Sequence, residues 1–374
     1  MYGRAVLIRS VHFEPWNVEL SEPFGIATGA QQLAENALVE VELDDGSRGL
    51  GEAAPFPAVN GETQSDALAA LQAAAPLVTG FRQGHDLDLP DDARALLAAA
   101  PSALAALEMA LLDAHCRSRG VSLFRHFGGR QRELLTDITI PTGNADAAVA
   151  AARRALEQGF QTLKIKVGGQ PFDHDLGRLR AIAAAAPQAR LLLDANASLE
   201  AEAAIALVAA LGVARQQVVL FEQPCQRGDL SGARRVREAG IRVAADEDAR
   251  DIADLEQLAA ERAADVVNFK LTKCGVAETL RMIDAARSLG FGLMLGGMVE
   301  TRLAMTVSAC IAGGQGGVEA GFEELDLDTP LFMLDQRLDG GFAQTGPRLD
   351  LGGIALGHGV SRRRPRQERG QAEF

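Results

Sequence analysis

The sequence predicts an α/β fold, a (β/α)8-type barrel with an α+β capping domain, on the strength of two observations. Short apolar runs that end in ionisable residues recur between residues 162 and 270, with helix-like segments between them. From Lys166, the steps to the next such ends are 28, 28, 24 and 24 residues, reaching Asp194, Glu222, Asp246 and Lys270. A step of this length fits one strand and the helical crossover that parallel strands need. We interpret the region as consecutive βα units.

Counting strands in both directions completes the barrel, which we assign to residues 128–330. The first strand is expected at residues 134–140, the seventh at 292–298 and the eighth near 318–322. Eight such units in about 200 residues fit a (β/α)8 barrel. A doubly wound open sheet is the alternative, but it usually carries a glycine-rich phosphate loop, and no Gly-x-Gly-x-x-Gly follows Ile140.

The flanking segments are expected to form the cap. Residues 1–127 begin with strand-like runs, in which a turn signal at residues 44–47 predicts a hairpin, and they continue with Ala- and Leu-rich helical stretches. Residues 20–30 are rich in Gly and Pro, so we expect an irregular segment there, either an exposed connection or a mobile lid. Residues 331–374 return to short strands and should pack back on the N-terminal unit.

Composition and charge exclude several classes of protein. The formal net charge of −13 argues against nucleic acid as a partner, because phosphate binding needs a concentrated basic face. The basic cluster at residues 362–366 is interpreted as a solvated terminal segment. No apolar run reaches the roughly 18 residues of a membrane span, and no export signal is visible. The four cysteines lack metal or disulfide spacing, so we expect reduced thiols in a cytoplasmic protein.

Carboxylates end three neighbouring strands of the predicted barrel. The carboxyl ends of barrel strands face one common mouth, which places Asp194, Glu222 and Asp246 together. Each acid alone would be read as a helix cap or loop residue, but three at one rim repel one another unless a cation lies among them. Oxygen ligands in this number suit Mg²⁺. Asn196 and Glu247 would then orient the ligands or nearby lysines.

Lysines flank this predicted metal site on both sides. Lys164 and Lys166 are two residues apart and share one face of the second strand, while Lys270 ends the sixth strand, opposite the second in a ring of eight. Two opposed bases suit epimerisation or racemisation at a carbon α to a carboxylate. No His ends a predicted barrel strand. A Schiff-base lysine, as in an aldolase, is the alternative, but that chemistry needs no metal.

Five motifs in order resemble the enolase superfamily in its muconate lactonizing enzyme subgroup. They are Lys-x-Lys at Lys164, Asp-x-Asn at Asp194, Glu-Gln-Pro at Glu222, Ala-Asp-Glu at Ala245 and the sixth-strand Lys270. The resemblance covers nearly the whole chain, including a capping domain built from both termini. It implies that Lys166 and Lys270 are the acid/base pair, that Asp194, Glu222 and Asp246 bind Mg²⁺, and that Lys164 helps to bind the substrate carboxylate.

Residues outside the barrel core carry the predicted specificity. Asp326 and Asp328 resemble the Asp-x-Asp motif by which dipeptide epimerases hold the free α-ammonium of a dipeptide, although two acids in a loop are more often solvated surface. Relatives that act on Ala-Glu have an arginine in the lid near Ile26, and this lid has none. We therefore expect a non-acidic residue at the epimerised position, contacted by Phe24 and Ile26. Thr139 and Met298 complete the expected substrate-binding set.

The sequence thus predicts a Mg²⁺-dependent dipeptide epimerase that moves a proton at the α-carbon of the C-terminal residue. The alternatives are an N-acylamino acid racemase or o-succinylbenzoate synthase on the same scaffold, and, from another class, a ligand-binding protein without catalysis. A dipeptide is the expected small-molecule partner. We further expect a homo-oligomer with no nucleic acid or membrane partner.

Overall fold

The structure is a computed structural model that describes residues 6–27, 29–315, 321–334 and 337–363. Three predicted features fall partly outside these residues: the start of the chain, part of the eighth strand expected near residues 318–322, and the end of the basic cluster. No helix in the described part is long and apolar enough to cross a membrane.

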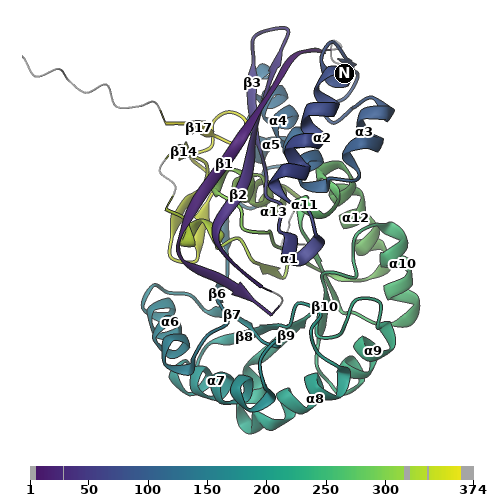
Figure 1. Cartoon of the computed structure of the whole chain (residues 1–374). Helices are drawn as coiled ribbons and strands as arrows, with labels where there is room; N and C mark the ends of the chain where they lie inside the picture. The colour runs from purple at the N-terminus through teal and green to yellow at the C-terminus, as the bar shows by residue number, and fades with distance from the viewer. Residues whose placement is uncertain (1–5, 28, 316–320, 335–336, 364–374) are drawn as a thin grey trace, which may run out of the picture.

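The N-terminal strands form an antiparallel sheet in the order β3-β2-β1-β4. Their bounds are β1 Val6–Ile26, β2 Gly29–Leu43, β3 Arg48–Ala53 and β4 Arg82–Gln83. The hairpin expected at residues 44–47 is confirmed, since it joins β2 to β3. Helices follow, with bounds α1 Pro57–Asn60, α2 Gln64–Val78, α3 Asp91–Leu97, α4 Pro101–Ser118 and α5 Leu123–His126. Together they form the cap above the strands of the second sheet (Figure 1).

The prediction of an irregular segment at residues 20–30 is largely wrong. Phe24 pairs with Gln31 and Ile26 with Gly29, so β1 and β2 continue as a long hairpin that reaches down toward the barrel (Figure 1). The irregularity is confined to a register shift between Glu19 and Phe24. Pro lacks the amide that a ladder hydrogen bond needs, which suits a shift at this point.

Helix α4 joins the cap to the rest of the molecule. All its residues from Ser102 to Cys116 are buried, as expected of a helix covered on every side. A Cβ at Gly51 of β3 would lie 1.9 Å from the Ala106 carbonyl oxygen, so the glycine lets α4 pack directly on the sheet. Glu108 of α4 accepts the Val276 amide at 2.5 Å and so caps a helix of the second unit.

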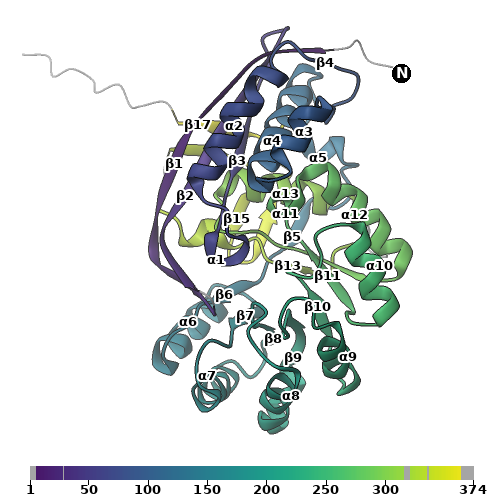
Figure 2. The same cartoon turned by 45° about the vertical axis from the view of Figure 1, so that its right-hand side comes forward.

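The second unit is a curled parallel sheet of eight strands in sequential order, which confirms the predicted α/β fold. The strands are β6 Ile138–Ile140, β7 Thr162–Lys166, β8 Arg190–Asp194, β9 Val218–Glu222, β10 Val243–Ala245, β11 Val266–Phe269, β12 Gly292–Leu295 and β13 Glu324–Leu325. The helices between them are α6 Ala145–Glu157, α7 Phe172–Ala185, α8 Ala201–Ala210, α9 Leu230–Glu238, α10 Ile252–Glu261, α11 Leu271–Cys274, α12 Val276–Leu289 and α13 Arg302–Gln315. Helices α6 to α10 form an arc outside the strands (Figures 1 and 2).

Two strand predictions need correction, and both concern the edges of this sheet. The expected first strand, residues 134–140, is two strands: β5 Glu133–Leu135 pairs antiparallel with β16 Arg348–Asp350, and only β6 joins the parallel sheet. The eighth strand lies at Glu324–Leu325. It begins with a charged residue, so it cannot be recognised as an apolar run, and an ion pair between Arg190 and Glu324 compensates this charge.

Among the described residues, the curled sheet closes without a ladder between its edges. Strands β6 and β13 are the two ends of the strand order. The Asp137 amide donates to the Leu325 carbonyl at 2.9 Å, and the Thr139 amide donates to the Asp328 carboxylate at 2.5 Å. The two edges therefore meet through single hydrogen bonds, and acidic side chains gather at the seam.

The C-terminal segment contacts the cap through short strands and arginines. Its strands are β14 Leu338–Gly340, β15 Ala343–Thr345, β16 and β17 Val360–Arg362. The Arg337 guanidinium lies 3.8 Å from the ring centre of Trp16 in β1, and the Leu334 amide donates to the Glu19 carbonyl at 2.9 Å. The domain boundaries drawn at residues 127 and 330 stay predictions.

Candidate active site

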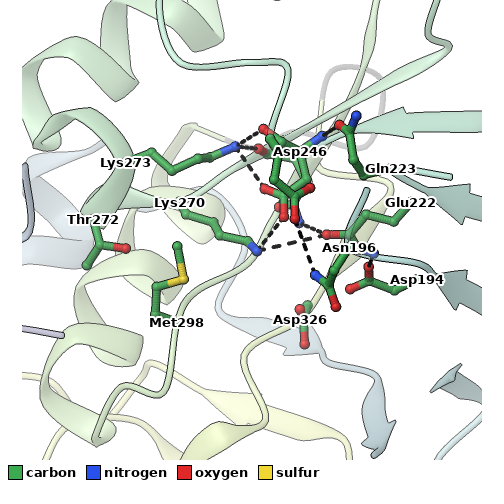
Figure 3. A network of polar contacts seen from close by, with 12 residues as sticks. Asp194, Asn196, Glu222, Gln223, Asp246, Lys270, Thr272, Lys273, Met298 and Asp326 are labelled. Atoms are coloured by element: carbon green, nitrogen blue, oxygen red, sulfur yellow. Dashed lines mark hydrogen bonds and ion pairs between the residues drawn. The ribbon is translucent and has the colours of Figure 1, made fainter. Parts of the chain in front are cut away.

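Three carboxylates end adjacent strands, and every lysine of the chain meets them. Asp194 ends β8, Glu222 ends β9 and Asp246 follows β10, and each is at most 1% exposed. The chain has only four lysines, and all contact these carboxylates: Lys164, Lys166, Lys270 and Lys273. Figure 3 shows Lys270 and Lys273 pointing to Asp246. All four lysines therefore lie at the carboxyl end of the parallel sheet, and the other permanently charged basic residues of the chain are arginines.

Ammonium groups lie between the three carboxylates. Lys164 Nζ bridges Asp194 and Glu222 at 3.0 and 2.7 Å. Lys270 Nζ lies 2.7 Å from Asp246 and 3.9 Å from Glu222. The oxygens of the three acids do not all lie within 4.8 Å of one another. The site is therefore arranged around lysine charges.

The donor set nevertheless fits a divalent cation. Burial, followed by the charge of Asp194, raises the pKa of Glu222 to about 7. Its Oε2 atom accepts no hydrogen bond within the described part of the chain and is compensated by the ion pair with Lys164. Burial opposes the charge of Asp246, but Lys270 and Lys273 outweigh it and lower the pKa of that acid. A buried cluster of carboxylate oxygens of this kind suits Mg²⁺.

Lys164 lies deepest among the lysines. It is 1% exposed, and its Nζ also lies 2.6 Å from Asp326 Oδ2. Burial opposes its charge, but Asp326, Glu222 and Asp194 outweigh burial and raise its pKa well above the usual range. Lys164 and Lys166 both contact Asp194 Oδ2, and this shared negative charge offsets the repulsion between their ammonium groups. Lys164 therefore remains a cation.

Strained turns follow two of the carboxylates and orient their neighbours. Asn196 and Gln223 adopt left-handed backbone, with φ of 43° and 32°, which costs energy in residues other than glycine. Gln223 Oε1 accepts the Asp246 amide at 3.0 Å, so the turn after β9 fixes the end of β10. Asn196 accepts from Lys166 at 3.3 Å and donates to Glu247 at 3.4 Å. The two predicted orienting residues are thus linked to one lysine.

A small cavity lies between these lysines and the cap. Its polar wall includes Lys166 from β7 and Lys270 from the end of β11, four strands away in the sheet order. Its apolar wall comes mainly from the cap and is made of Phe24, Ile26, Phe56, Val59 and Met298. The cavity volume is about 20 Å³, which suffices for about one water molecule. A larger molecule can therefore enter only if the cap or the lining side chains move.

The hairpin tip closes the cavity by resting on two loops of the barrel. The Thr142 amide, after β6, donates to the Gly25 carbonyl at 3.2 Å. Gly169, after β7, faces Ala27, and a Cβ at this glycine would lie 2.5 Å from the Ala27 carbonyl oxygen. The hairpin tip can therefore take this closed position only because residue 169 is a glycine.

Asp326 lines the cavity, whereas Asp328 does not. Asp328 is fully buried and accepts the amide of Thr139, a cavity residue. The two acids meet a third, Asp137, and oxygens of all three lie within 4.8 Å of one another. Both Asp137 oxygens lack hydrogen-bond partners among the residues described. Burial, followed by the charges of Asp326 and Asp328, raises the pKa of Asp137 well above its usual range.

Sequence reasoning missed several residues of the site, among them Lys273, Asp137 and Val59. Lys273 could have been found from its spacing, one helical turn after Lys270. Asp137 lies two residues before Thr139 and would share its face on an extended strand. Val59 offered no signal, because only the folded cap brings helix α1 over the mouth (Figure 1).

Comparison with known proteins agrees with this geometry. The mandelate racemase/muconate lactonizing enzyme N-terminal domain matches residues 8–128, and the enolase C-terminal domain-like family matches residues 147–361. An aromatic dipeptide epimerase of Herpetosiphon aurantiacus is 46% identical over 95% of this chain and 98% of its own. An L-Ala-D/L-Glu epimerase of Thermotoga maritima is 34% identical over 88% of this chain and 94% of its own.

A solved structure shows the same architecture. The dipeptide epimerase of Enterococcus faecalis, complexed with Mg and the dipeptide L-Leu-L-Tyr, superposes with a TM-score of 0.87 at 30% identity. The alignment covers 95% of this chain and all of that one. These matches confirm the resemblance that the five motifs predicted. The chain belongs to the mandelate racemase/muconate lactonizing enzyme family, within the enolase superfamily.

Proposed function

We propose that this protein is a Mg²⁺-dependent dipeptide epimerase that moves a proton at the α-carbon of the C-terminal residue. One observation carries the proposal: Lys166 and Lys270 come from strands on opposite sides of the curled sheet and line the same small cavity. A carbon held between them can lose a proton to one amine and receive one from the other. The names of the relatives support the same activity.

Asp194, Glu222 and Asp246 would hold the metal. When bound, Mg²⁺ supplies the positive charge that stabilises the substrate carboxylate as its α-proton leaves. The lysines that now contact these acids, chiefly Lys164 and Lys270, would then be free to turn toward the substrate. In this arrangement Lys164 holds the carboxylate, and Asn196 orients Lys166.

The acids at the seam of the sheet provide a place for the dipeptide ammonium. Asp326 faces the cavity, with Asp137 and Asp328 behind it. Charge-assisted hydrogen bonds are the strong ones for a buried cation. Of these three acids only Asp326 has a lysine within 4.0 Å, so the cluster has negative charge left for a substrate ammonium. Substrates of N-acylamino acid racemases and o-succinylbenzoate synthases lack this ammonium and would leave the cluster without a partner. The dipeptide is therefore the preferred substrate class over these alternatives.

The apolar wall favours a hydrophobic or aromatic side chain at the epimerised position. Phe24, Ile26 and Phe56 come from the cap and are at most 7% exposed, and Val59 and Met298 complete the wall. An acidic side chain would be buried here without a cation. The epimerase of Herpetosiphon aurantiacus, named for aromatic dipeptides, supports the same preference.

Turnover of Ala-Phe and Ala-Leu is expected to exceed that of Ala-Glu by roughly 100-fold or more in kcat/KM, because an unpaired buried charge costs several kcal/mol. Polarimetry with Mg²⁺ present measures it, and EDTA should abolish all turnover. The Ile26→Arg variant should gain activity on Ala-Glu by offering a cation, whereas the matched Ile26→Leu variant should not. A wild-type preference for Ala-Glu contradicts the proposed substrate.

Closure of the hairpin tip gives a second prediction. Gly169→Ala should raise KM by about tenfold, equivalent to about 1.4 kcal/mol, because its Cβ would meet the Ala27 carbonyl. Gly120→Ala is the control: its φ of 67° matches the 69° of Gly169, but a Cβ there meets nothing within 4 Å. Both variants should lose about 1–2 kcal/mol of folding stability from the left-handed backbone. Equal KM values for the two would show that the tip does not need this contact.

The remaining expectations belong to the same proposal. We place the enzyme in the cytoplasm as a homo-oligomer without nucleic acid or membrane partners, and we divide it into a cap, residues 1–127, a barrel, residues 128–330, and a returning segment, residues 331–374. The negative net charge of −13 supports the absence of nucleic acid. A non-catalytic binding protein would have no use for paired lysines. Observing exchange of the substrate α-proton in D₂O would exclude this alternative directly.

A further inference from the structure

Arg178 is a buried guanidinium outside the catalytic mouth. It lies on helix α7 and is 1% exposed. Its donors reach three main-chain carbonyl oxygens: those of Lys166 and Pro141, each at 2.6 Å, and that of Ile140 at 3.2 Å. Burying a charge is costly unless strong hydrogen bonds compensate it. A planar fork can hold several carbonyls in fixed positions, which an ammonium cannot do.

The carbonyls held by Arg178 lie at the ends of β6 and β7. One belongs to Lys166, so the guanidinium fixes the backbone from which that side chain enters the mouth. Another belongs to Pro141, whose neighbour Thr142 donates its amide to Gly25 of the hairpin tip. The same side chain thus contacts a proposed base and one of the two loops on which the tip rests.

Asp175, one turn earlier on α7, holds the other loop. Its Oδ2 atom accepts the Gly168 amide at 2.7 Å, and the next residue, Gly169, faces Ala27 of the tip. Asp175 is 4% exposed. Helix α7 therefore presents two buried charges that hold both loops beneath the hairpin tip together with the Lys166 carbonyl.

We propose that Arg178, together with Asp175, is a positioning pair that fixes Lys166 and the seat of the closed hairpin tip as one unit. The inference rests on the proposed function, because it takes Lys166 as one of two opposed bases. Arg178 touches no reacting atom and acts through Lys166 and the two loops. Displacing it moves one base and leaves the other, Lys270, on the far side of the sheet.

Isotope exchange separates the two bases. In D₂O, each epimer first loses its α-proton to the lysine that faces it, and that lysine can return a deuteron before the other acts. The epimer facing Lys166 is the one whose exchange disappears in Lys166→Ala. A defect confined to Lys166 therefore slows exchange of that epimer and spares the other.

The experiment uses full-length Arg178→Lys and Arg178→Met with Mg²⁺, and follows deuterium uptake by mass spectrometry from each epimer of Ala-Phe. We expect exchange of the epimer facing Lys166 to fall roughly 100-fold, the scale of a 1 Å misplacement, while exchange of the other changes less than threefold. KM should rise for both. Arg180→Met, on the same helix but exposed and bonded to the Ala210 carbonyl at 2.6 Å, is the matched control and should behave as wild type.

Equal slowing of both epimers, or no slowing of either, overturns the positioning role. If Arg178→Met does not fold, Arg178→Lys decides the question, because it keeps the charge and loses the fork. The wild-type enzyme distinguishes the two levels of inference. If it exchanges no dipeptide, the proposed function fails; if it does and the Arg178 variants show no bias, only the positioning role fails.

Discussion

Lys270→Ala is expected to lower epimerisation by roughly 100- to 10,000-fold, the contribution of a positioned general acid or base. The variant should still exchange the α-proton of the epimer that faces Lys166. The reason is geometric, since the two amines enter one cavity from opposite sides of the sheet. Lys166→Ala should show the mirror pattern, losing exchange of that epimer and keeping exchange of the other. Polarimetry and deuterium uptake from each epimer measure both effects.

Metal binding is the control for these lysine variants. Removing Lys270 takes a cation from Asp246, which it contacts at 2.7 Å, so Mg²⁺ affinity should not fall. Selective ¹⁵N-lysine labelling suits this test, because the chain's four lysines all lie at the site. Each Nζ signal should shift as Mg²⁺ is added to the wild-type enzyme. A Lys270→Ala enzyme that epimerises at the wild-type rate refutes the two-base mechanism.

Asp326→Asn is expected to lower kcat/KM for free dipeptides by roughly 30- to several-thousand-fold, which corresponds to the about 2–5 kcal/mol lost when one partner of a buried charge pair is removed. The effect on an N-acetylated dipeptide should be far smaller, because that substrate brings no ammonium to the cluster. The measured quantity is the ratio of kcat/KM for Ala-Phe to that for N-acetyl-Ala-Phe. The ratio cancels any general effect on Lys164, which also contacts Asp326.

Glu324→Gln provides the matched control, on the strand that immediately precedes Asp326. Glu324 lies two residues before Asp326 and pairs with Arg190, which begins β8, away from the carboxyl end of the sheet. Its replacement should leave the ratio of free to acetylated substrate unchanged. If Asp326→Asn lowers kcat/KM equally for the free and the acetylated dipeptide, Asp326 acts only through its contact with Lys164. That result would favour the racemase alternative.

The corrected strands show where a sequence pattern loses information. The eighth strand begins with Glu324, which pairs with Arg190 at the start of β8, and Glu323 just before it pairs with Arg242, so the segment is not recognisable as an apolar run. The segment at residues 134–140 changes partners halfway, from β16 to the parallel sheet, although its composition is continuous. In both places the chain follows contacts made by residues far away in sequence, which local periodicity cannot show.

The hairpin tip illustrates the same limit for the site. Glycine and proline at residues 20–30 predicted an irregular loop, yet pairing of Phe24 with Gln31 keeps most of it in strand. The prediction that Phe24 and Ile26 reach the substrate came from the resemblance, and the structure places both on the cavity wall. No local pattern could place Val59 there, because the fold of the cap decides which face of α1 covers the mouth.

The sequence by itself determined the order and spacing of the charged strand ends, and therefore the parallel sheet, the acid trio and the two lysines. A parallel strand followed by a helix has a narrow range of lengths, so regular spacing in sequence becomes regular spacing around the mouth. Only the tertiary structure decided that Lys164 lies among three carboxylates, that Asp137 stands behind Asp326, and that Arg178 holds the Lys166 carbonyl. These are contacts between distant segments, and burial gives them their strength.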